Sequence, residues 1–313
     1  MSVTDVPRAR RRRRARGPAR RFSVGDRVVI SVFIGVPAVL VAMLIWGAAL
    51  AAIVLSFSSW DGIGGFSSLK WIGWDNYSNI FTNYPPFWPA LGHNLAWLMV
   101  FSVIAAPLGL FFAVLIDSGF KGALFYESAL FLPVMLSTAL IGIIWQLIYS
   151  PDEGLINGLL GTAGSPEAID WLGNPRVNLW ATLVAACWRQ IGYVMILYLA
   201  GLKGVDSTIK EAAVMDGCNA WQVFRHATFP SLAPLSVVVL VVTVIESLRS
   251  FDLVYIINGG TNGLELISAL VTTTTIGEAS RIGYGSALGT ILLVLSLVPI
   301  SVFLLQSFKR KVV

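Results

Sequence analysis

The chain has 313 residues, of which 56% are hydrophobic and only 12% are charged, and its formal net charge is +5. Soluble domains carry about 25% charged residues, so this composition excludes an ordinary soluble domain and indicates a membrane protein. The two cysteines, Cys187 and Cys218, lie in an apolar segment and in a polar loop, so no disulfide framework is expected. The two histidines, His93 and His226, are far apart, which argues against a histidine-based metal site.

Ten arginines occur within residues 1–27, which contain almost no apolar side chains. Such a segment cannot bury enough apolar surface to fold, so we expect a disordered cytoplasmic tail beside anionic lipid. An arginine-rich run also suits nucleic acid, but we expect no nucleic-acid partner because a long apolar segment follows directly.

Six apolar segments follow this tail and predict membrane-spanning helices, because about 20 apolar residues in a helix cross a bilayer. The first segment is too long for the core of a signal peptide, so it is interpreted as an uncleaved helix. We therefore expect an all-α membrane protein with one six-helix domain over residues 28–313. The segments cover about residues 28–57, 95–116, 123–149, 179–202, 235–257 and 285–308.

Lysine and arginine are distributed unevenly over the loops, and their placement predicts the orientation of the chain. With both termini in the cytoplasm, the cytoplasmic side carries 17 of these residues and the outer loops carry 3. We therefore expect a multi-pass plasma-membrane protein whose loop between the fourth and fifth helices lies in the cytoplasm.

That loop, at about residues 203–231, has a composition that suits a short docking element. Ala212 and Ala213 lack bulk and let another surface approach closely, while Gly217 permits a sharp turn between two short helical pieces. Either Asp216 or Asn219 could cap the second helical piece. We expect a docking surface made of two short helices joined at a glycine.

Two prolines close the same loop. Pro230 and Pro234 are expected to end the local structure and to restart the chain as a membrane helix. Val223, Phe224 and Phe229 give the loop an apolar side.

The residues of this loop follow a known order. Glu211-Ala212-Ala213 is followed by Asp216-Gly217-Cys218, then by Phe224 and by Phe229-Pro230. This order resembles the cytoplasmic EAA loop of bacterial ABC importer permeases, with Cys218 where the family usually has alanine. In that family the loop forms a coupling helix that sits in a cleft on a separate ATPase subunit. The resemblance thus implies an ATPase-coupling role for Glu211, Ala212, Ala213, Asp216, Gly217, Phe224 and Pro230.

Shorter motifs elsewhere fit the carbohydrate-uptake branch of this family. The family has a proline after the glycine pair in the last long loop, and Gly259-Gly260 lacks it, so this turn is expected to differ. The matching stretches are Trp60-Asp61, Gly73–Tyr77, Phe131-Leu132-Pro133, Trp145, Gly154–Asn157 and Leu199–Leu202.

The resemblance implies a set of partners: two ATPase subunits, a second and different permease chain, an extracellular solute-binding protein, and a sugar or oligosaccharide as substrate. No Gly-Lys dipeptide occurs in the chain, so there is no phosphate-binding loop of the Gly-Lys-Ser/Thr type. ATP and magnesium are therefore expected on the partner ATPase. We expect no catalytic residue, no metal ligand and no cofactor on this chain, and transport by alternating access.

Charged residues inside the predicted spans are costly and usually face protein or a water-filled cavity. Arg189 lies about 15 Å from the outer end of the fourth helix, and Glu246 lies about 17 Å from the inner end of the fifth. Because these helices run in opposite directions, we predict that Arg189 and Glu246 are near neighbours. The competing pair is Glu246 with Arg249, three residues further along the same helix.

Either pairing leaves one arginine over. It could hydrogen-bond a sugar hydroxyl or a ligand phosphate, or all these charges could merely join helices. Aromatic rings also suit sugars, so the expected substrate pathway comprises Arg189, Trp188, Tyr193, Glu246 and Arg249.

Three alternatives to a sugar importer remain open at this point. One is an importer of an anionic substrate of the glycerol-3-phosphate type. A second is an ion-driven secondary transporter with Glu246 as its proton site, which leaves the Glu-Ala-Ala loop unexplained. A third is an intramembrane enzyme, for which the sequence offers no serine–histidine, metal or paired-carboxylate constellation.

Overall fold

The computed structural model describes residues 23–63, 65–277 and 280–311. Helices dominate this part of the chain, and its β pairing is confined to one isolated bridge between Ser58 and Trp71. The all-α fold class is therefore confirmed. The described chain divides into a first unit that ends at Ala51 and a second unit that begins at Ala52.

The first unit consists of α1 (Val24–Val41), the π-helical turn η1 (Ala42–Gly47) and the beginning of α2 (Ala48–Leu55). Ser23 caps α1, because its hydroxyl accepts from the Asp26 amide at 3.1 Å while the Asp26 carboxylate accepts from the Ser23 amide at 2.9 Å. The helix therefore begins four residues before the predicted span. Residues 24–55 form an apolar helix long enough to cross a bilayer.

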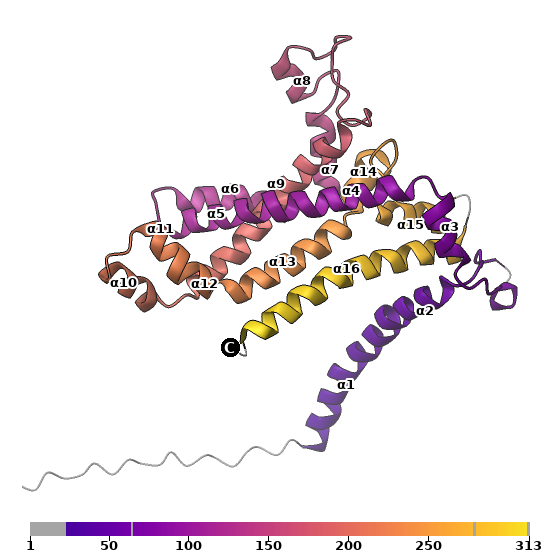
Figure 1. The fold of residues 1–313 in the computed structure, drawn as a ribbon, viewed down its shortest axis with the longest axis horizontal. Coiled ribbons are helices and arrows are strands. Elements are labelled where there is room, and N and C mark those ends of the chain that lie inside the picture. Colours follow the sequence, from indigo (N-terminus) through magenta and orange to yellow (C-terminus); the bar gives the residue numbers. More distant parts are fainter. Residues whose placement is uncertain (1–22, 64, 278–279, 312–313) are drawn as a thin grey trace, which may run out of the picture. The chain divides into compact units, whose positions relative to one another are not determined.

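Three long continuous helices of the second unit match the second, fourth and sixth predicted spans. They are the run of α4 (Phe87–Val100), η3 (Phe101–Ala105) and α5 (Ala106–Asp117), then α9 (Asn178–Lys203), and finally α16 (Ile282–Lys311). Figure 1 shows α4 and α5 running alongside α9.

Helix α9 forms the centre of the second unit, with apolar clusters packed on it from α4 and α5, from α6 (Ala123–Met135) and from α13 (Ala233–Leu248). Glycines allow these close approaches. A Cβ added at Gly109 would lie 2.6 Å from Val194, and a Cβ added at Gly192 would collide with the carbonyl oxygen of Leu130 on α6. The packing of α5 and α6 against α9 therefore depends on residues without side chains.

The third predicted span is broken, so the expected single helix over 123–149 is wrong. It consists of α6 (Ala123–Met135) and α7 (Thr138–Ile148), which meet at an angle of 103°. Leu136 is extended, and the Ser137 hydroxyl accepts from the Leu140 amide at 3.2 Å, which starts a new helix. Pro133 lies inside α6 and is not the site of the break.

The fifth predicted span is interrupted near its end, between α13 (Ala233–Leu248) and α14 (Asp252–Asn258). Before this span, a bend of 71° at Leu232 separates α13 from the helical stretch that ends with the short helix α12 (Phe229–Ser231). Counting each bent pair as one span, the described helices provide six membrane crossings, which agrees with the prediction.

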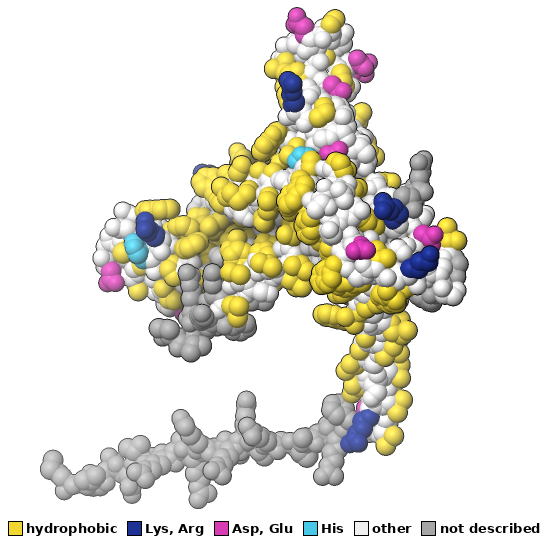
Figure 2. Space-filling view, turned by 45° about the vertical axis from the view of Figure 1, so that its right-hand side comes forward, with side chains coloured by type: hydrophobic (Ala, Val, Ile, Leu, Met, Phe, Trp, Pro, Cys, Tyr) yellow, Lys and Arg dark blue, Asp and Glu magenta, His cyan; other side chains and the backbone are white. Residues whose placement is uncertain are grey.

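The remaining helices are short, and most of them lie near the ends of the bundle of the second unit, whereas α8 stands apart beyond α7 (Figure 1). Helices α10 to α12 lie at one end, while α3, α14 and α15 lie at the opposite end (Figure 1). Between these ends hydrophobic side chains cover much of the visible surface, and charged side chains gather towards the extremities (Figure 2). This distribution suits a protein surrounded by lipid. The short elements are η2 (Phe66–Ser68), α3 (Asp75–Asn83), α8 (Leu155–Leu160), α10 (Ser207–Met215), α11 (Ala220–Val223), η4 (Phe224–Thr228) and α15 (Ile267–Ile276).

Candidate functional site

The segment 203–231, called the coupling segment below, begins with helix α10. Asp206 caps this helix, and its carboxylate accepts from the Thr208 amide at 2.9 Å. This backbone hydrogen bond, supported by the Thr208 side chain, lowers the pKa of Asp206 below its ordinary value of 3.8. The cap is therefore charged at neutral pH.

Gly217 forms the turn that ends α10. Its φ angle is +82°, in the left-handed region that favours glycine. The Gly217 amide donates to the Val214 carbonyl at 3.0 Å, and the Cys218 amide donates to the Ala213 carbonyl at 3.1 Å. This pair of bonds is a Schellman motif, which also favours an apolar contact between the positions of Cys218 and Ala213. The predicted glycine turn is confirmed.

Asn219, and not Asp216, caps the second helical piece, α11. The Asn219 side chain accepts from the Gln222 amide at 2.9 Å, and the Gln222 side chain accepts from the Asn219 amide at 2.8 Å. Asp216 instead forms the C-cap of α10. The expectation that Pro230 ends the local structure is wrong, because Pro230 lies inside the helical stretch Ala220–Ser231, which ends at the bend at Leu232.

The coupling segment exposes apolar side chains on its surface. Met215 is 87% exposed and Trp221 is 64% exposed, and Ile209, Val214 and Phe229 are also exposed. A helix that served only as a connection would gain nothing from these groups, whereas a docking surface needs them.

The predicted coupling residues fall into four groups by their place in the structure. Gly217 makes the turn, and Phe224 packs its ring 5.6 Å from that of Trp221 and 5.9 Å from that of Phe229, measured between centroids. Glu211 is exposed. The other four residues line a shallow groove between the helical pieces, and these are Ala212, Ala213, Asp216 and Pro230.

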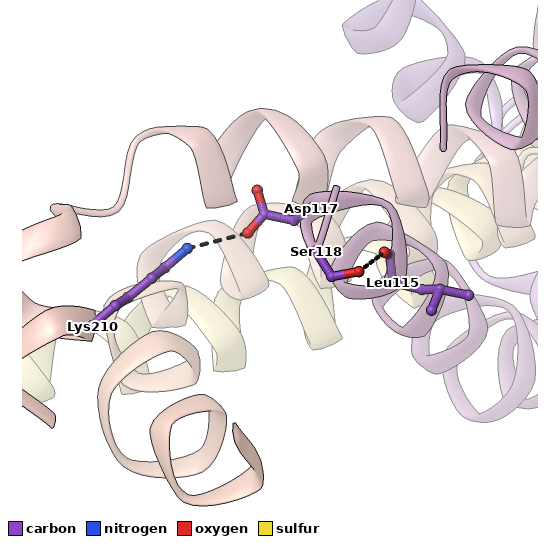
Figure 3. A network of polar contacts seen from close by, with 4 residues as sticks. All are labelled: Leu115, Asp117, Ser118 and Lys210. Atoms are coloured by element: carbon purple, nitrogen blue, oxygen red, sulfur yellow. Dashed lines mark hydrogen bonds and ion pairs between the residues drawn. The ribbon is translucent and has the colours of Figure 1, made fainter. Parts of the chain in front are cut away.

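One ion pair connects the coupling segment to the membrane bundle. Lys210 Nζ on α10 lies 3.2 Å from Asp117 Oδ2 at the last residue of α5, and both side chains are partly buried. Figure 3 shows this contact, together with the hydrogen bond by which Ser118 donates to the Leu115 carbonyl. A carboxylate is unfavourable at the C-terminal end of a helix, so Lys210 compensates a charge that α5 alone would disfavour. Nothing in the sequence analysis had identified this pair.

A second candidate site is a cavity of about 160 Å³ within the bundle. Its walls come from α4 and η3, the start of α7, the middle of α9 and the break between α13 and α14. Side chains of both charge signs line it, next to aromatic and small polar groups. The lining includes Trp97, Phe101, Thr138, Arg189, Gln190, Glu246, Arg249, Ser250 and Asp252.

Arg189 and Glu246 are neighbours in this cavity, as predicted from their depth. Arg189 Nη1 lies 3.8 Å from Glu246 Oε2, and both side chains are a little over one-third exposed. The competing pair of Glu246 with Arg249 is not among the ion pairs of the described residues. Arg249 and Asp252 are exposed residues of the same lining.

Three buried N–H groups of this lining have no hydrogen-bond partner. They are Arg189 Nε, Gln190 Nε2 and Trp97 Nε1. Gln190 is 3% exposed and Trp97 is 1% exposed. A buried donor without a partner costs about 1–3 kcal/mol.

Two residues of the expected pathway do not line the cavity. Trp188 packs against Trp145, with ring centroids 5.9 Å apart, and is part of the surroundings of an apolar cluster. Tyr193 is also outside the lining. Trp97 and Phe101 also line the cavity, and they could not be recognised from the sequence because the only polar residue of their long apolar segment is Ser102. Groups of three or more side chains suited to hold a metal are absent from the residues that the structure describes.

Comparison with known proteins gives a consistent result. Residues 105–313 match a family described as binding-protein-dependent transport system inner membrane component. The chain is 34% identical to the arabinooligosaccharides transport system permease protein AraP of Bacillus subtilis, over 77% of this chain and 78% of that one. It is 29% identical to the xylose/arabinose import permease protein XacH of Haloferax volcanii, over 93% and 92% of the two chains.

A solved structure has the same fold. The crystal structure of a bacterial ABC transporter involved in the import of the acidic polysaccharide alginate matches with a TM-score of 0.76, over 90% of this chain and 96% of that one. The two chains are 20% identical, so this likeness concerns the arrangement of helices and not the substrate.

Proposed function

The chain belongs to the family of binding-protein-dependent transport system inner membrane components, and from this premise we propose that it is the sugar-translocating permease of an ATP-driven importer. It is a multi-pass membrane subunit, and ATP hydrolysis takes place on a separate chain. Its partners in the proposed complex are two ATPase subunits, a second permease and an extracellular solute-binding protein.

The coupling segment carries this proposal. The matched family region includes it, its Glu-Ala-Ala and Asp-Gly residues build a capped helix and a Schellman turn, and its exposed apolar side chains offer a docking surface. We assign the contact with the ATPase to Glu211, Ala212, Ala213, Asp216, Gly217, Phe224 and Pro230. Through this contact, closure of the ATPase pair then shifts the permease from one of its two alternating-access states to the other.

A sugar or oligosaccharide is the proposed substrate. Two relatives named for arabinooligosaccharides and for xylose and arabinose support this class. Arg189, Glu246 and Arg249 line the cavity in the bundle and are the proposed pathway residues of this chain. Trp188 packs against Trp145 beside an apolar cluster, and Tyr193 is outside the lining.

We further propose that both termini face the cytoplasm. The excess of lysine and arginine at the termini and in the coupling segment supports this orientation. It places the coupling segment on the side of the membrane where ATP is available.

Purification of the tagged chain in mild detergent tests the proposal. We expect an ATPase and a second six-span chain to purify with it, and expect both Gly217→Pro and Gly217→Val to lose the ATPase. Gly217→Asn is the matched control, because asparagine tolerates the left-handed conformation. A parent chain that purifies alone would contradict the proposal.

A further inference from the structure

Helix α3 lies where three membrane-spanning helices end. The apolar helix that ends at Leu55 precedes it in the chain, and the helix over residues 87–117 follows it. Helix α16 begins beside it, since Tyr284 packs its ring 5.5 Å from that of Tyr84, the residue after α3. All three helices are long and apolar enough to cross a bilayer. Helix α3 therefore lies at the level of a membrane surface, at the end of the bundle opposite α10 to α12 (Figure 1).

The buried face of α3 holds the helix in this place. Asn76 Nδ2 donates to the carbonyl oxygens of Ser56 and Ser58, at 2.8 Å each. Tyr77 Oη lies 2.7 Å from Ser56 Oγ. Ile80 is fully buried in an apolar cluster with residues of α4, α15 and α16. The helix is therefore a packed part of the second unit and not a loose loop.

The outward side of α3 has an aromatic face and a polar face. Trp74 and Phe81 are seven residues apart, so they lie on the same face of the helix. Their side chains are 69% and 45% exposed. Asp75 and Thr82 each follow one of these aromatic residues, so they lie about 100° further round the helix axis, and both are exposed. Each aromatic residue thus has a polar neighbour that faces another way.

Exposed tryptophans also flank the helix. Trp71 is 63% exposed and Trp88 is 57% exposed. Trp88 Nε1 donates to the Phe81 carbonyl at 3.2 Å, whereas the indole N–H groups of Trp71 and Trp74 have no acceptor in the part of the chain that the structure describes. We call these four residues the aromatic rim: Trp71, Trp74, Phe81 and Trp88.

Two observations favour lipid over a soluble protein as the partner of the aromatic rim. Tryptophan combines a large apolar ring with one N–H donor, which suits the boundary between acyl chains and headgroups, and the rim lies at the ends of three spanning helices. Charge is also scarce, because Asp75 is the only acidic or basic residue within 71–90. The electrostatic complementarity that guides soluble partners to a docking site has a single charge to act on here.

We propose that α3 and the aromatic rim form an interfacial anchor in the headgroup region of the leaflet opposite the coupling segment. The aromatic rings enter the boundary between headgroups and acyl chains, while Asp75 and Thr82 face water. Interfacial tryptophans help to set the tilt of the helices next to them, so this anchor fixes α4 and α16 relative to the bilayer. The inference goes beyond the proposed function and depends neither on the substrate nor on the ATPase.

Spin labels on single cysteines test the anchor. The intact complex is isolated through a tag on this chain and reconstituted in liposomes of phosphatidylethanolamine and phosphatidylglycerol. The background is Cys218→Ala, because Cys187 is buried and Cys218 is partly exposed. Labels are compared within two pairs of neighbours, Trp74→Cys with Asp75→Cys and Phe81→Cys with Thr82→Cys. The measurement is the collision rate with molecular oxygen, which concentrates in lipid, and with a water-soluble nickel chelate.

The expected result is a difference within each pair. The apolar face of an interfacial helix enters the membrane by about 5–10 Å, so the ratio of oxygen to nickel collisions should be at least about threefold higher at the aromatic position than at its polar neighbour. Equal ratios within the two pairs would overturn the anchor. The anchor is also overturned if nickel collisions at Trp74 and Phe81 are frequent and fall only when the binding protein is added, because the rim then docks a protein.

A second measurement keeps the native backbone free of labels. Lipids brominated next to the headgroup quench the emission of a tryptophan that they touch. The double variant Trp71→Phe with Trp74→Phe should therefore lose part of the quenchable emission of the complex. Quenchable emission equal to that of the parent would contradict the anchor and would leave the importer proposal untouched.

Discussion

Loss of the ion pair between Asp117 and Lys210 should loosen the coupling helix from the membrane bundle. The two charged groups lie 3.2 Å apart, and the side chains are 25% and 31% exposed. At an effective dielectric constant of about 20, this separation corresponds to a Coulomb energy of about 5 kcal/mol. Desolvation and side-chain ordering offset most of it, and measured exposed pairs contribute about 0.2–1 kcal/mol. Because this pair is partly buried and joined by a hydrogen bond between charged groups, we expect a net contribution of about 1–2 kcal/mol.

A double-mutant cycle isolates this contribution. Asp117→Ala and Lys210→Ala should each speed hydrogen exchange of the α10 amides about 5- to 30-fold, which is the equivalent of 1–2 kcal/mol. The double variant should exchange no faster than either single variant, because the second substitution removes nothing more. In the reconstituted complex, the same variants should move less sugar for each ATP hydrolysed.

Ser118→Ala is the control for this cycle. Ser118 neighbours Asp117 but hydrogen-bonds only within its own helix end, to the Leu115 carbonyl at 2.6 Å. It should leave exchange in α10 unchanged. If the increases in α10 exchange caused by Asp117→Ala and Lys210→Ala add up in the double variant, the ion pair does not connect α5 and α10. The same conclusion follows if Ser118→Ala speeds α10 exchange as much as they do.

Four further outcomes follow from the structure. Gly217→Ala should destabilise the turn after α10 by about 1–2 kcal/mol, seen as faster exchange there, whereas Gly217→Asn should cost less. The folded-state pKa of Asp206 is lowered, so its cap stabilises α10 above the ordinary pKa of 3.8, and this stabilisation is lost as the pH falls through the folded-state pKa. Exchange of the Thr208 amide, corrected for intrinsic rates, should therefore rise as the pH falls below 3.8, and Asp206→Asn should abolish that dependence. Gly192→Ala should lower the free energy of unfolding of the purified chain by about 1–3 kcal/mol and so lower its melting temperature, because the added methyl group meets the Leu130 carbonyl. Gly289→Ala is the control and should leave the melting temperature unchanged, because Gly289 has open space around it. Asn157→Ala should speed amide hydrogen exchange in residues 150–178, because this buried side chain hydrogen-bonds to Ser150, Ile169 and Trp171 and its loss removes at least about 2 kcal/mol of stabilisation. Unchanged exchange in these residues would contradict that role.

The six spans could be predicted from the sequence because hydropathy alone determines which segments lie in lipid. The break between α6 and α7 could not, because its only local sign is Ser137, a capping residue inside an apolar run. Whether such a serine starts a helix or hydrogen-bonds within one is decided by the packing around it.

The candidate site was predicted in part for a similar reason. The depth of a residue in the membrane follows from its position along the helix, so Arg189 and Glu246 could be predicted to lie at a similar depth. The structure places the two side chains 3.8 Å apart. The direction in which a residue faces could not be read in an apolar helix without a polar stripe, so Trp188 was placed in the pathway and Trp97 was overlooked. Gly217 was recognisable because left-handed turns select glycine.

The most direct measurement is uptake of a neutral sugar by liposomes that contain the complex isolated through this chain, with its binding protein outside. ATP inside the liposomes should drive accumulation, and a non-hydrolysable ATP analogue or Gly217→Pro should abolish it. Accumulation that proceeds without ATP and follows an imposed proton gradient would contradict the account and would make Glu246 a proton-coupling site.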